Sequence, residues 1–600
     1  MVACLAACGA QPRATAPRPA AAAPYWQQRA DYTIRARLDD QSGVLAATGT
    51  LAYVNQSPDT LRELWVHQHL NAFRPASIWS QVDARENRTR FQALAEPDFA
   101  YERFTAPPTV DGVPVRVDYP GAPDSTVARL TLARPLAPGA RVEVGFAWEA
   151  RPSTVPRRQG RKGRHVDFAQ WYPKVAVYDR GGWQVNALQP AGEFYGEFGD
   201  FTVTLDVAAD QVCGATGVPV AGDPGWPSAG GRKVVTFAAR DVHHFGFSCD
   251  PEYRYEGGTY VRTARVVGQR YRTWDTVAIH VLYRPGDDST WGRGVAVRRT
   301  AEALGWLESV FGAYGYPQVT NLHRLDGGGT EFPMMMMNGS AGAGLILHEL
   351  GHIYAYGMLA NNEWRSGWMD EGLTSYQEAW RDARTRIDRG RVQQMREPRW
   401  EAPAMPDSVA RRSMAYFAGP AAQPMGTNAK DFSDFARYNQ MVYGRAEQMY
   451  GQLRDVLGDT LFRAFLRDYH ARWAFRHVDR AAMQSSAETV AGRSLEWFFA
   501  QWVDSTGVQR YRLRDVRSVP SGSEWVTTAR LVREGRYRHP MPVGVRTAQG
   551  WTIVRGDAGR DEQALTIRTT APPDLVRLDP LGVTEDWFAA GERWTPPPAP

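Results

Sequence analysis

The sequence is poor in lysine, in long apolar runs and in net charge, and each shortage argues against a class of protein. Only four of the 70 basic residues are lysines, a bias toward arginine that we attribute to genomic codon usage. No run of 18 or more apolar residues exists, so no membrane-spanning helix is expected. The net charge is only +5, and RRQGRKGRH at 157–165 is the one basic cluster, so no nucleic-acid partner is expected.

Cysteine is also scarce, with four in the whole chain. Residues 5–8, LAAC, have the form of the lipobox that bacterial lipoprotein signal peptidase cleaves, although the basic and most of the apolar part of a signal are missing. We therefore interpret residues 1–24 as a truncated lipoprotein-type signal and an Ala/Pro-rich tether, with Cys8 as a lipid anchor in the bacterial cell envelope or periplasm. A chance match in an alanine-rich terminus is the alternative. Cys213 and Cys249 either form a disulfide or are two buried thiols.

What the sequence does contain is typical of a packed multidomain protein. It has 600 residues, of which 43% are hydrophobic and 12% aromatic, and it includes 21 tryptophans. This aromatic content is well above that of disordered chains. The length alone allows roughly three to four domains.

Changes in hydrophobic period predict a multidomain α+β fold. Residues 25–274 alternate apolar and polar side chains between turn residues, which predicts an all-β domain. Residues 275–507 are mostly helical, with short strands at 318–337. Alternation returns at 508–590 with the spacing of a β-sandwich, and a Pro-rich tail follows at 591–600. The expected helices lie at 297–311, 343–359, 372–388, 444–456, 460–473 and 494–504.

The sharpest chemical motif is HELGH at 348–352. Side chains four residues apart on a helix point the same way, so His348 and His352 can share one metal ion. Glu349 lies about a quarter-turn away from His348, where it can reach water beside the metal without being a ligand.

Glu371 supplies the third ligand. It follows His352 after 18 residues, on the next predicted helix. Two histidines and one glutamate leave a fourth tetrahedral position open, as in hydrolytic zinc sites, whereas a structural site would take a fourth ligand such as cysteine. The residues therefore predict one Zn²⁺ per chain. Asp370 either supports the ligands from behind or has a surface or capping role.

HELGH, the spacing to Glu371 and GGTEFP at 328–333 resemble the M1 family of gluzincin metallopeptidases, whose members include aminopeptidase N and leukotriene A4 hydrolase. QWYPKVAVYD at 170–179 and EFYGEFGDF at 193–201 are similar to that family's saddle-shaped N-terminal β domain. The resemblance implies a thermolysin-like catalytic domain over 275–507 and a β-sandwich after it. The large helical C-terminal domain of many relatives does not fit after 508.

By this resemblance, Glu331 binds the free α-amino group of a peptide, with Gly328 and Gly329 beside it in the substrate site. A carboxylate at the blind end of a cleft pairs with an ammonium group and fixes which bond is cut. The alternative is a solvated loop acid. Thr330 and Phe332 depart from the family's Gly-Xaa-Met-Glu-Asn pattern, so side-chain preference is not carried over.

The resemblance also implies a tyrosine that stabilises the oxyanion. Tyr443 best matches the family segment Tyr-Xaa-Lys-Gly-Ala, with Arg445 in place of lysine and Ala446 in place of glycine. Tyr438 is the competitor, or else a second tyrosine that lines the same cavity.

Together these features predict a zinc-dependent aminopeptidase. Glu349 would act as general base toward a metal-activated water, and Tyr443 would donate to the oxyanion. Two alternatives are a zinc-binding family member without peptidase activity, such as a scaffold, and a hydrolase of another bond such as an epoxide. Peptides are the expected partners, and the sequence leaves the oligomeric state, preferred residue and physiological substrate open.

Two further groups have competing interpretations. Met334 to Met337 either line an apolar substrate pocket or belong to a buried strand, and the strand is favoured. We interpret four histidines as structural: His67 and His69 on one face of a strand, and His243 and His244 on opposite faces.

Overall fold

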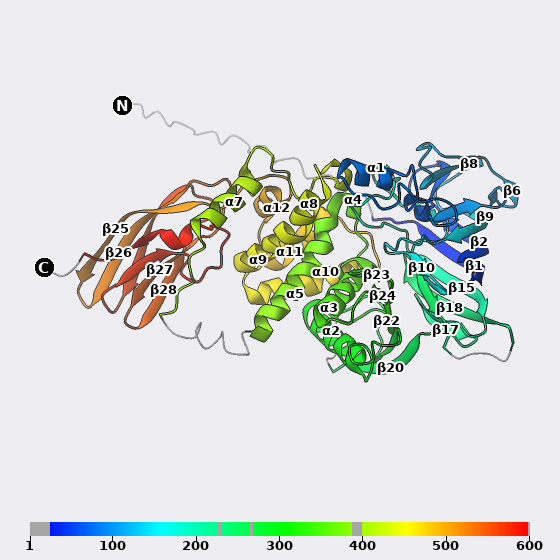
Figure 1. Cartoon of the computed structure of the whole chain (residues 1–600). Helices are drawn as coiled ribbons and strands as arrows, with labels where there is room; N and C mark the ends of the chain where they lie inside the picture. Colours follow the sequence, from blue (N-terminus) through cyan, green and yellow to red (C-terminus); the bar gives the residue numbers. More distant parts are fainter. Residues whose placement is uncertain (1–24, 226–229, 264–267, 387–398, 598–600) are drawn as a thin grey trace, which may run out of the picture.

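The computed structural model describes residues 25–225, 230–263, 268–386 and 399–597. Residues 1–24, with Cys8 and the expected tether, lie outside this part. The chain is a mixed α+β, multidomain protein in which a helical block lies between a sheet-rich N-terminal region and two small C-terminal sheets (Figure 1). Among the described residues, no helix combines the length and the apolar character needed to cross a bilayer.

The N-terminal region consists almost entirely of strands. β1 buries every second side chain, including Tyr32, Ile34 and Leu38, as the alternation predicted. It pairs in parallel with β15 and antiparallel with β2 at the centre of a nine-stranded sheet. The elements are β1 (Arg29–Asp39), β2 (Val44–Val54), β3 (Leu61–His67), η1 (His69–Ala72), α1 (Ile78–Arg85), β4 (Tyr101–Phe104), β5 (Thr109–Val110), β6 (Val113–Pro114), β7 (Val117–Asp118), β8 (Val127–Leu136), β9 (Arg141–Arg151), β10 (Gly160–Lys162), β11 (His165–Phe168), β12 (Lys174–Val175), β13 (Tyr178–Asp179), β14 (Gly182–Trp183), β15 (Gly199–Ala208), β16 (Val212–Ala215), β17 (Val218–Ala221), β18 (Arg232–Val242) and β19 (Phe247–Asp250).

Cys213 and Cys249 form a disulfide. The two residues face each other on the neighbouring antiparallel strands β16 and β19, with Cα atoms 4.2 Å apart. Of the two alternatives that the sequence left open, the structure therefore has the disulfide. A disulfide is typical of proteins in oxidising compartments, so this one is compatible with export.

The helical block packs against a five-stranded sheet with the order β20-β21-β22-β24-β23. β21, β22 and β24 are parallel, and α2 crosses over between the first two. β20 pairs with β21, so the boundary expected at 274/275 falls inside this sheet. The elements are β20 (Arg254–Val261), β21 (Thr276–Tyr283), α2 (Val295–Phe311), β22 (Gln318–His323), β23 (Gly329–Phe332), β24 (Met335–Asn338), α3 (Ala343–His352), η2 (Ile353–Gly357), α4 (Glu363–Ser366), η3 (Gly367–Met369), α5 (Glu371–Arg386), α7 (Asp407–Ala418), η5 (Ala429–Asp431), α8 (Phe435–Asn439), η6 (Gln440–Arg445), α9 (Ala446–Leu457), α10 (Asp459–Trp473), α11 (Arg480–Ala491) and α12 (Glu496–Val503).

The helices differ from the predicted ones in several respects. The helix expected at 343–359 ends at His352 and continues as the π-helical turn η2, and α9 is preceded by a second π-helical turn, η6. Such turns often occur at functional sites. α7 and α11 were not predicted, and α7 buries only Ala410 and Phe417. The four methionines at 334–337 are fully buried around β24, as the strand interpretation predicted.

Two small sheets form the C-terminal unit, residues 511–594, around a core of their own. β31 pairs with β30, so the paired strands extend into the expected tail at 591–600. The elements are β25 (Tyr511–Ser521), β26 (Glu524–Arg533), β27 (Pro542–Thr547), β28 (Gly550–Arg555), β29 (Glu562–Thr569), β30 (Leu575–Leu578), η7 (Ala589–Gly591) and β31 (Arg593–Trp594).

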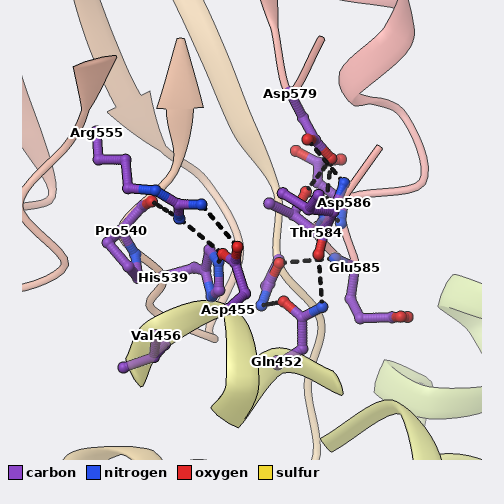
Figure 2. A network of polar contacts seen from close by, with 12 residues as sticks. Gln452, Asp455, Val456, His539, Pro540, Arg555, Asp579, Thr584, Glu585 and Asp586 are labelled. Atoms are coloured by element: carbon purple, nitrogen blue, oxygen red, sulfur yellow. Dashed lines mark hydrogen bonds and ion pairs between the residues drawn. The ribbon is translucent and has the colours of Figure 1, made fainter. Parts of the chain in front are cut away.

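A polar network attaches the C-terminal unit to α9 (Figure 2). Asp455 on α9 accepts from Nε2 of His539 at 2.7 Å and from both terminal nitrogens of Arg555 at 2.6 and 2.7 Å. One turn earlier, Gln452 donates to the carbonyl of Val583 at 2.9 Å. Bidentate charge-assisted bonds hold a fixed geometry, so the unit has a defined orientation on the helical block.

Two pairs of histidines, which are far apart from each other in the sequence, converge around the buried Lys174. The Nζ atom of Lys174 lies 3.1 Å from Nδ1 of His244, and the rings of His67 and His69 stack at 4.4 Å. We call this set the histidine cluster; its members are His67, His69, His243 and His244.

The prediction that His243 and His244 point to opposite faces is wrong. β18 ends at Val242, so the two residues lie in irregular chain, where strand alternation does not apply. Nε2 of His243 is 3.1 Å from the carbonyl oxygen of Tyr356, and Nε2 of His244 is 2.7 Å from its hydroxyl. The cluster thus joins the N-terminal region to η2, the turn that follows HELGH.

We expect the histidine cluster to make the fold acid-labile. Burial and the neighbouring Lys174 lower the pKa of His67 to about 3, and burial also lowers the pKa of His243 to about 3. Below pH about 6.5 the unfolded chain therefore binds protons that the folded protein does not. Stability should be full above that pH and fall through the window from about 6.5 to 3, by about 1.4 kcal/mol per histidine per pH unit.

Thermal unfolding of the wild type and of His67→Phe between pH 8 and pH 5 tests this expectation. The variant lacks one titrating group, so its melting temperature should fall less steeply with decreasing pH. Identical slopes for the two proteins would contradict a contribution from His67.

Candidate metal centre

The candidate centre is built on α3 and α5. α3 carries His348, Glu349 and His352, and its apolar residues Ile346, Leu347 and Leu350 are buried in the main core. Glu371 is the first residue of α5, which packs against α3. The packing of these two helices brings together His352 and Glu371, which have 18 residues between them in the sequence.

The three predicted ligands converge. Oε2 of Glu371 lies 3.1 Å from Nε2 of His352 and 3.5 Å from Nε2 of His348, and one donor atom from each residue lies within 4.8 Å of the other two. This buried oxygen has no hydrogen-bond partner despite its short distances to nitrogen. Ligand atoms that face one another without a hydrogen bond are the arrangement expected around a cation.

Outer carboxylates orient both imidazoles. Nδ1 of His352 lies 2.8 Å from Oδ2 of Asp370, and Nδ1 of His348 lies 3.3 Å from Oε2 of Glu378. A proton held on Nδ1 directs the lone pair of Nε2 toward the centre, as in carboxylate–histidine–metal triads. Asp370 therefore supports a predicted ligand from behind, as one of the two interpretations of the sequence expected. Glu378 does the same for His348, and the sequence analysis did not identify it.

Glu349 lies against β23. A Cβ atom added to Gly329 would be 2.0 Å from Cδ of Glu349, so only glycine allows the strand to approach this closely. Gly328 comes just before the strand and has a positive φ of 73°, which favours glycine. Arg324 donates to Thr330 and supports this turn, so the Thr330 hydroxyl is already bonded.

Glu331 is buried on β23, and one of its oxygens lies within 4.8 Å of donor atoms of Glu349 and His352. It is therefore not a solvated loop acid. Burial raises its pKa well above the ordinary value, and the Glu193 carboxylate adds to this, whereas His352 and Arg158 lower it.

Arg158 and Glu193 form a buried ion pair beside the centre. Glu193 raises the pKa of Arg158, although burial alone would lower it, and Glu331 and Tyr443 also interact with the guanidinium. The sequence marked Arg158 only as part of a basic cluster and Glu193 only as part of a segment that resembles the family, and it indicated no role at the centre for either residue.

Tyr443 is the tyrosine that contacts a predicted ligand, Glu371. It belongs to η6, and its hydroxyl donates to Oε1 of Glu371. Tyr438 belongs to α8, where its ring packs edge-on against Phe432 and its buried hydroxyl has no hydrogen-bond partner among the described residues.

The buried carboxylates at the centre would be stabilised by a cation. Burial alone would raise the pKa of Glu371, but His352 and His348 lower it. Burial raises the pKa of Glu349, because its neighbours do not fully offset the loss of water. A divalent ion offsets this excess of buried carboxylates.

Comparisons with known proteins match one segment of the chain to a described family. Residues 335–502 match the description "Peptidase family M1 domain". The chain carries a peptidase family M1 domain. It contains all three predicted ligands, Glu349 and both tyrosines, whereas Gly328, Gly329 and Glu331 lie just before the matched residues.

Aminopeptidase N of Streptomyces lividans is 22% identical to this chain over 264 residues, which are 39% of this chain and 27% of that protein. The chain thus matches about a quarter of that relative's length. Among solved structures, an M1 zinc metallopeptidase from Deinococcus radiodurans has a TM-score of 0.53 at 17% identity, covering 80% of this chain and 93% of that one. Aminopeptidase A of Legionella pneumophila, solved with aspartic acid, has a TM-score of 0.62 at 11% identity, covering 93% and 59%. At these identities the structures show a shared fold.

The M1 family implies one Zn²⁺ per chain, and the residues of this M1 domain fit it. Two imidazole nitrogens and a carboxylate oxygen are ligands that zinc prefers, and they leave a fourth position open. The unpartnered oxygen of Glu371 and the two outer carboxylates are the observations that support this fit.

Proposed function

We propose that the chain is a zinc-dependent aminopeptidase that removes N-terminal residues from peptides. The observation that carries this proposal is the convergence of His348, His352 and Glu371, beside a second group in which donor atoms of Glu331 and Glu349 lie near His352. A metal centre flanked by one acid for water and another for an ammonium group has the parts needed for exopeptidase chemistry.

His348, His352 and Glu371 would hold the Zn²⁺. When bound, Zn²⁺ supplies a Lewis acid that polarises the scissile carbonyl and lowers the pKa of water toward about 7. Glu349 takes a proton from the attacking water and then returns it to the leaving amine, as a base that becomes an acid. Tyr443 turns its hydroxyl from Glu371 to the oxyanion and donates a hydrogen bond there.

Glu331 fixes the substrate. Its buried carboxylate has an oxygen with no hydrogen-bond partner, so an incoming ammonium group would satisfy it. Gly328 and Gly329 come just before this carboxylate, and a Cβ atom on Gly329 would collide with Glu349. Because the ammonium position sets which carbonyl reaches the metal, the enzyme cleaves one residue from the N-terminus.

Acetylating the N-terminus of a peptide should therefore abolish its cleavage. The acetyl amide carries no charge, so the buried Glu331 would remain unpaired when the peptide binds. The measurement compares hydrolysis of a free and an N-acetylated peptide of the same sequence by mass spectrometry, with and without a chelator. Equal rates for the two peptides would indicate an endopeptidase, and hydrolysis that resists chelation would contradict the zinc centre.

The same assay, extended to a panel of aminoacyl-coumarin substrates and one epoxide, separates the alternatives. A scaffold would bind zinc and turn over none of the substrates, and an epoxide hydrolase would turn over only the epoxide. Glu349 and Tyr443 favour peptide hydrolysis, because a scaffold needs neither a base nor an oxyanion donor.

We also propose that the three structural units are a saddle-shaped β domain, a thermolysin-like catalytic domain and a β-sandwich, as the family resemblance implies. An exported, cell-envelope location with a lipid on Cys8 remains a proposal too, and the disulfide supports the export. Mass spectrometry of the mature N-terminus tests it, since an unmodified Cys8 would exclude the anchor.

A further inference from the structure

Arg445 lies two residues after Tyr443, and its side chain is buried in a cage of four aromatic rings. Two rings come from α7 and α12 of the helical block, and two come from loops of the C-terminal unit. The distances from the guanidinium carbon to the ring centroids are 4.6 Å for Phe417, 4.3 Å for Trp502, 5.5 Å for Tyr537 and 5.9 Å for Trp587.

Polar contacts add to the cage. Arg445 donates to the carbonyl oxygen of Gly507 at 2.9 Å, in the link between α12 and β25, and it lies 3.9 Å from Oε2 of Glu585. The Glu585 segment is tied to α9 by a chain of hydrogen bonds through Gln509 and Gln452 (Figure 2). Arg445 is therefore fixed by both the helical block and the C-terminal unit.

The two sides of η6 have different neighbours. Residues two apart in a helical turn point in nearly opposite directions, so Tyr443 faces Glu371 while Arg445 enters the cage. On the α5 side, a Cβ atom on Gly372 would lie 2.3 Å from Cβ of Ala446, which leaves no space between α5 and this segment. A shift of Arg445 would therefore move Tyr443.

We propose that Arg445 is a positioning residue through which the C-terminal unit holds Tyr443 at the metal centre; this rests on the proposed function. Arg445 stands where the family pattern has lysine. Arginine suits this cage better, because a planar guanidinium stacks on rings and donates several hydrogen bonds at once. Tyr537 supports this coupling, since its ring belongs to the main core rather than to the core of its own unit.

Kinetics of Arg445→Met in the full chain test the proposal. The loss of Tyr443 positioning should lower kcat by about 100-fold, toward the value of Tyr443→Phe, with KM and zinc content nearly unchanged. The control is Arg454→Met on α9. The guanidinium of Arg454 also stacks on a ring, that of Trp380 at 4.3 Å, but Arg454 lies more than two helical turns after η6. Its kcat should equal that of the wild type.

Trp587→Leu opens the cage from the C-terminal unit alone and covers the case in which Arg445→Met does not fold. A double-mutant cycle with Tyr443→Phe separates positioning from general damage. If Trp587 acts through Tyr443, the double variant should be no slower than Tyr443→Phe. Additive losses, or wild-type kcat in both cage variants, would overturn the proposal. Absence of any turnover in the wild type would instead refute the proposed function.

Discussion

Glu349→Gln should abolish peptide hydrolysis while the protein keeps its zinc. Glu349 is not among the three converging ligands, but its carboxylate lies within reach of the same centre. The amide of glutamine keeps the shape of the side chain and cannot accept the proton of water. Loss of general acid–base catalysis of this kind costs about 100- to 10,000-fold. We would measure kcat on an aminoacyl-coumarin substrate and zinc by elemental analysis of the same sample.

The matched control is Glu302→Gln on α2, whose side chain is 64% exposed. It makes the same chemical change at the surface, so its kcat and zinc content should equal those of the wild type. If Glu349→Gln retained turnover, another residue would have to be the base. If it lost its zinc, Glu349 would be needed to build the centre rather than to transfer protons.

Gly329→Ala should also lower the rate strongly, although it removes no charged group. The added methyl would lie 2.0 Å from Cδ and 2.1 Å from Oε1 of Glu349, far inside van der Waals contact. Either the Glu349 carboxylate or strand β23 with Glu331 must then move by about 1 Å, and a shift of that size can cost on the order of 100-fold in rate. Steady-state kinetics, with melting temperature measured in parallel, test the expectation.

Gly327→Ala is the matched control for this variant. It lies two residues earlier on the same turn, and a Cβ atom there would meet no atom within 4 Å. Its kinetics should be those of the wild type. A fully active Gly329→Ala would mean that Glu349 and β23 can separate without loss, which would contradict the close approach as a requirement for catalysis.

Spacing along one helix was the most informative signal in the sequence. A pair of histidines four residues apart must share a face of α3, so the ligand pair was predictable before any fold was known. Strand alternation was equally direct in β1, because its period follows from the pleat of the chain. The helix that includes His352 was predicted too long, since the change from α3 to the π-turn η2 leaves the apolar pattern unbroken.

Contacts between distant segments gave no local signal. Glu378 supports His348 from the next helix, and Arg158 and Glu193 reach Glu331 from irregular chain of another unit. Likewise, the histidine cluster joins residues more than 170 positions apart, and no pattern in the sequence linked the two pairs.

By itself, then, the amino-acid sequence determined the chemical identity of the centre: two imidazoles, one carboxylate ligand and one acid beside them. The two imidazoles and the acid beside them follow from residue type and helical repeat, which act over a few positions, whereas the carboxylate ligand was predicted from its spacing of 18 residues and the family resemblance. Only the tertiary structure decided which tyrosine meets Glu371, which carboxylates orient the histidines and how Arg445 joins the helical block to the C-terminal unit. Such pairings depend on how whole elements pack, and packing is set by the burial of many side chains at once rather than by any short pattern.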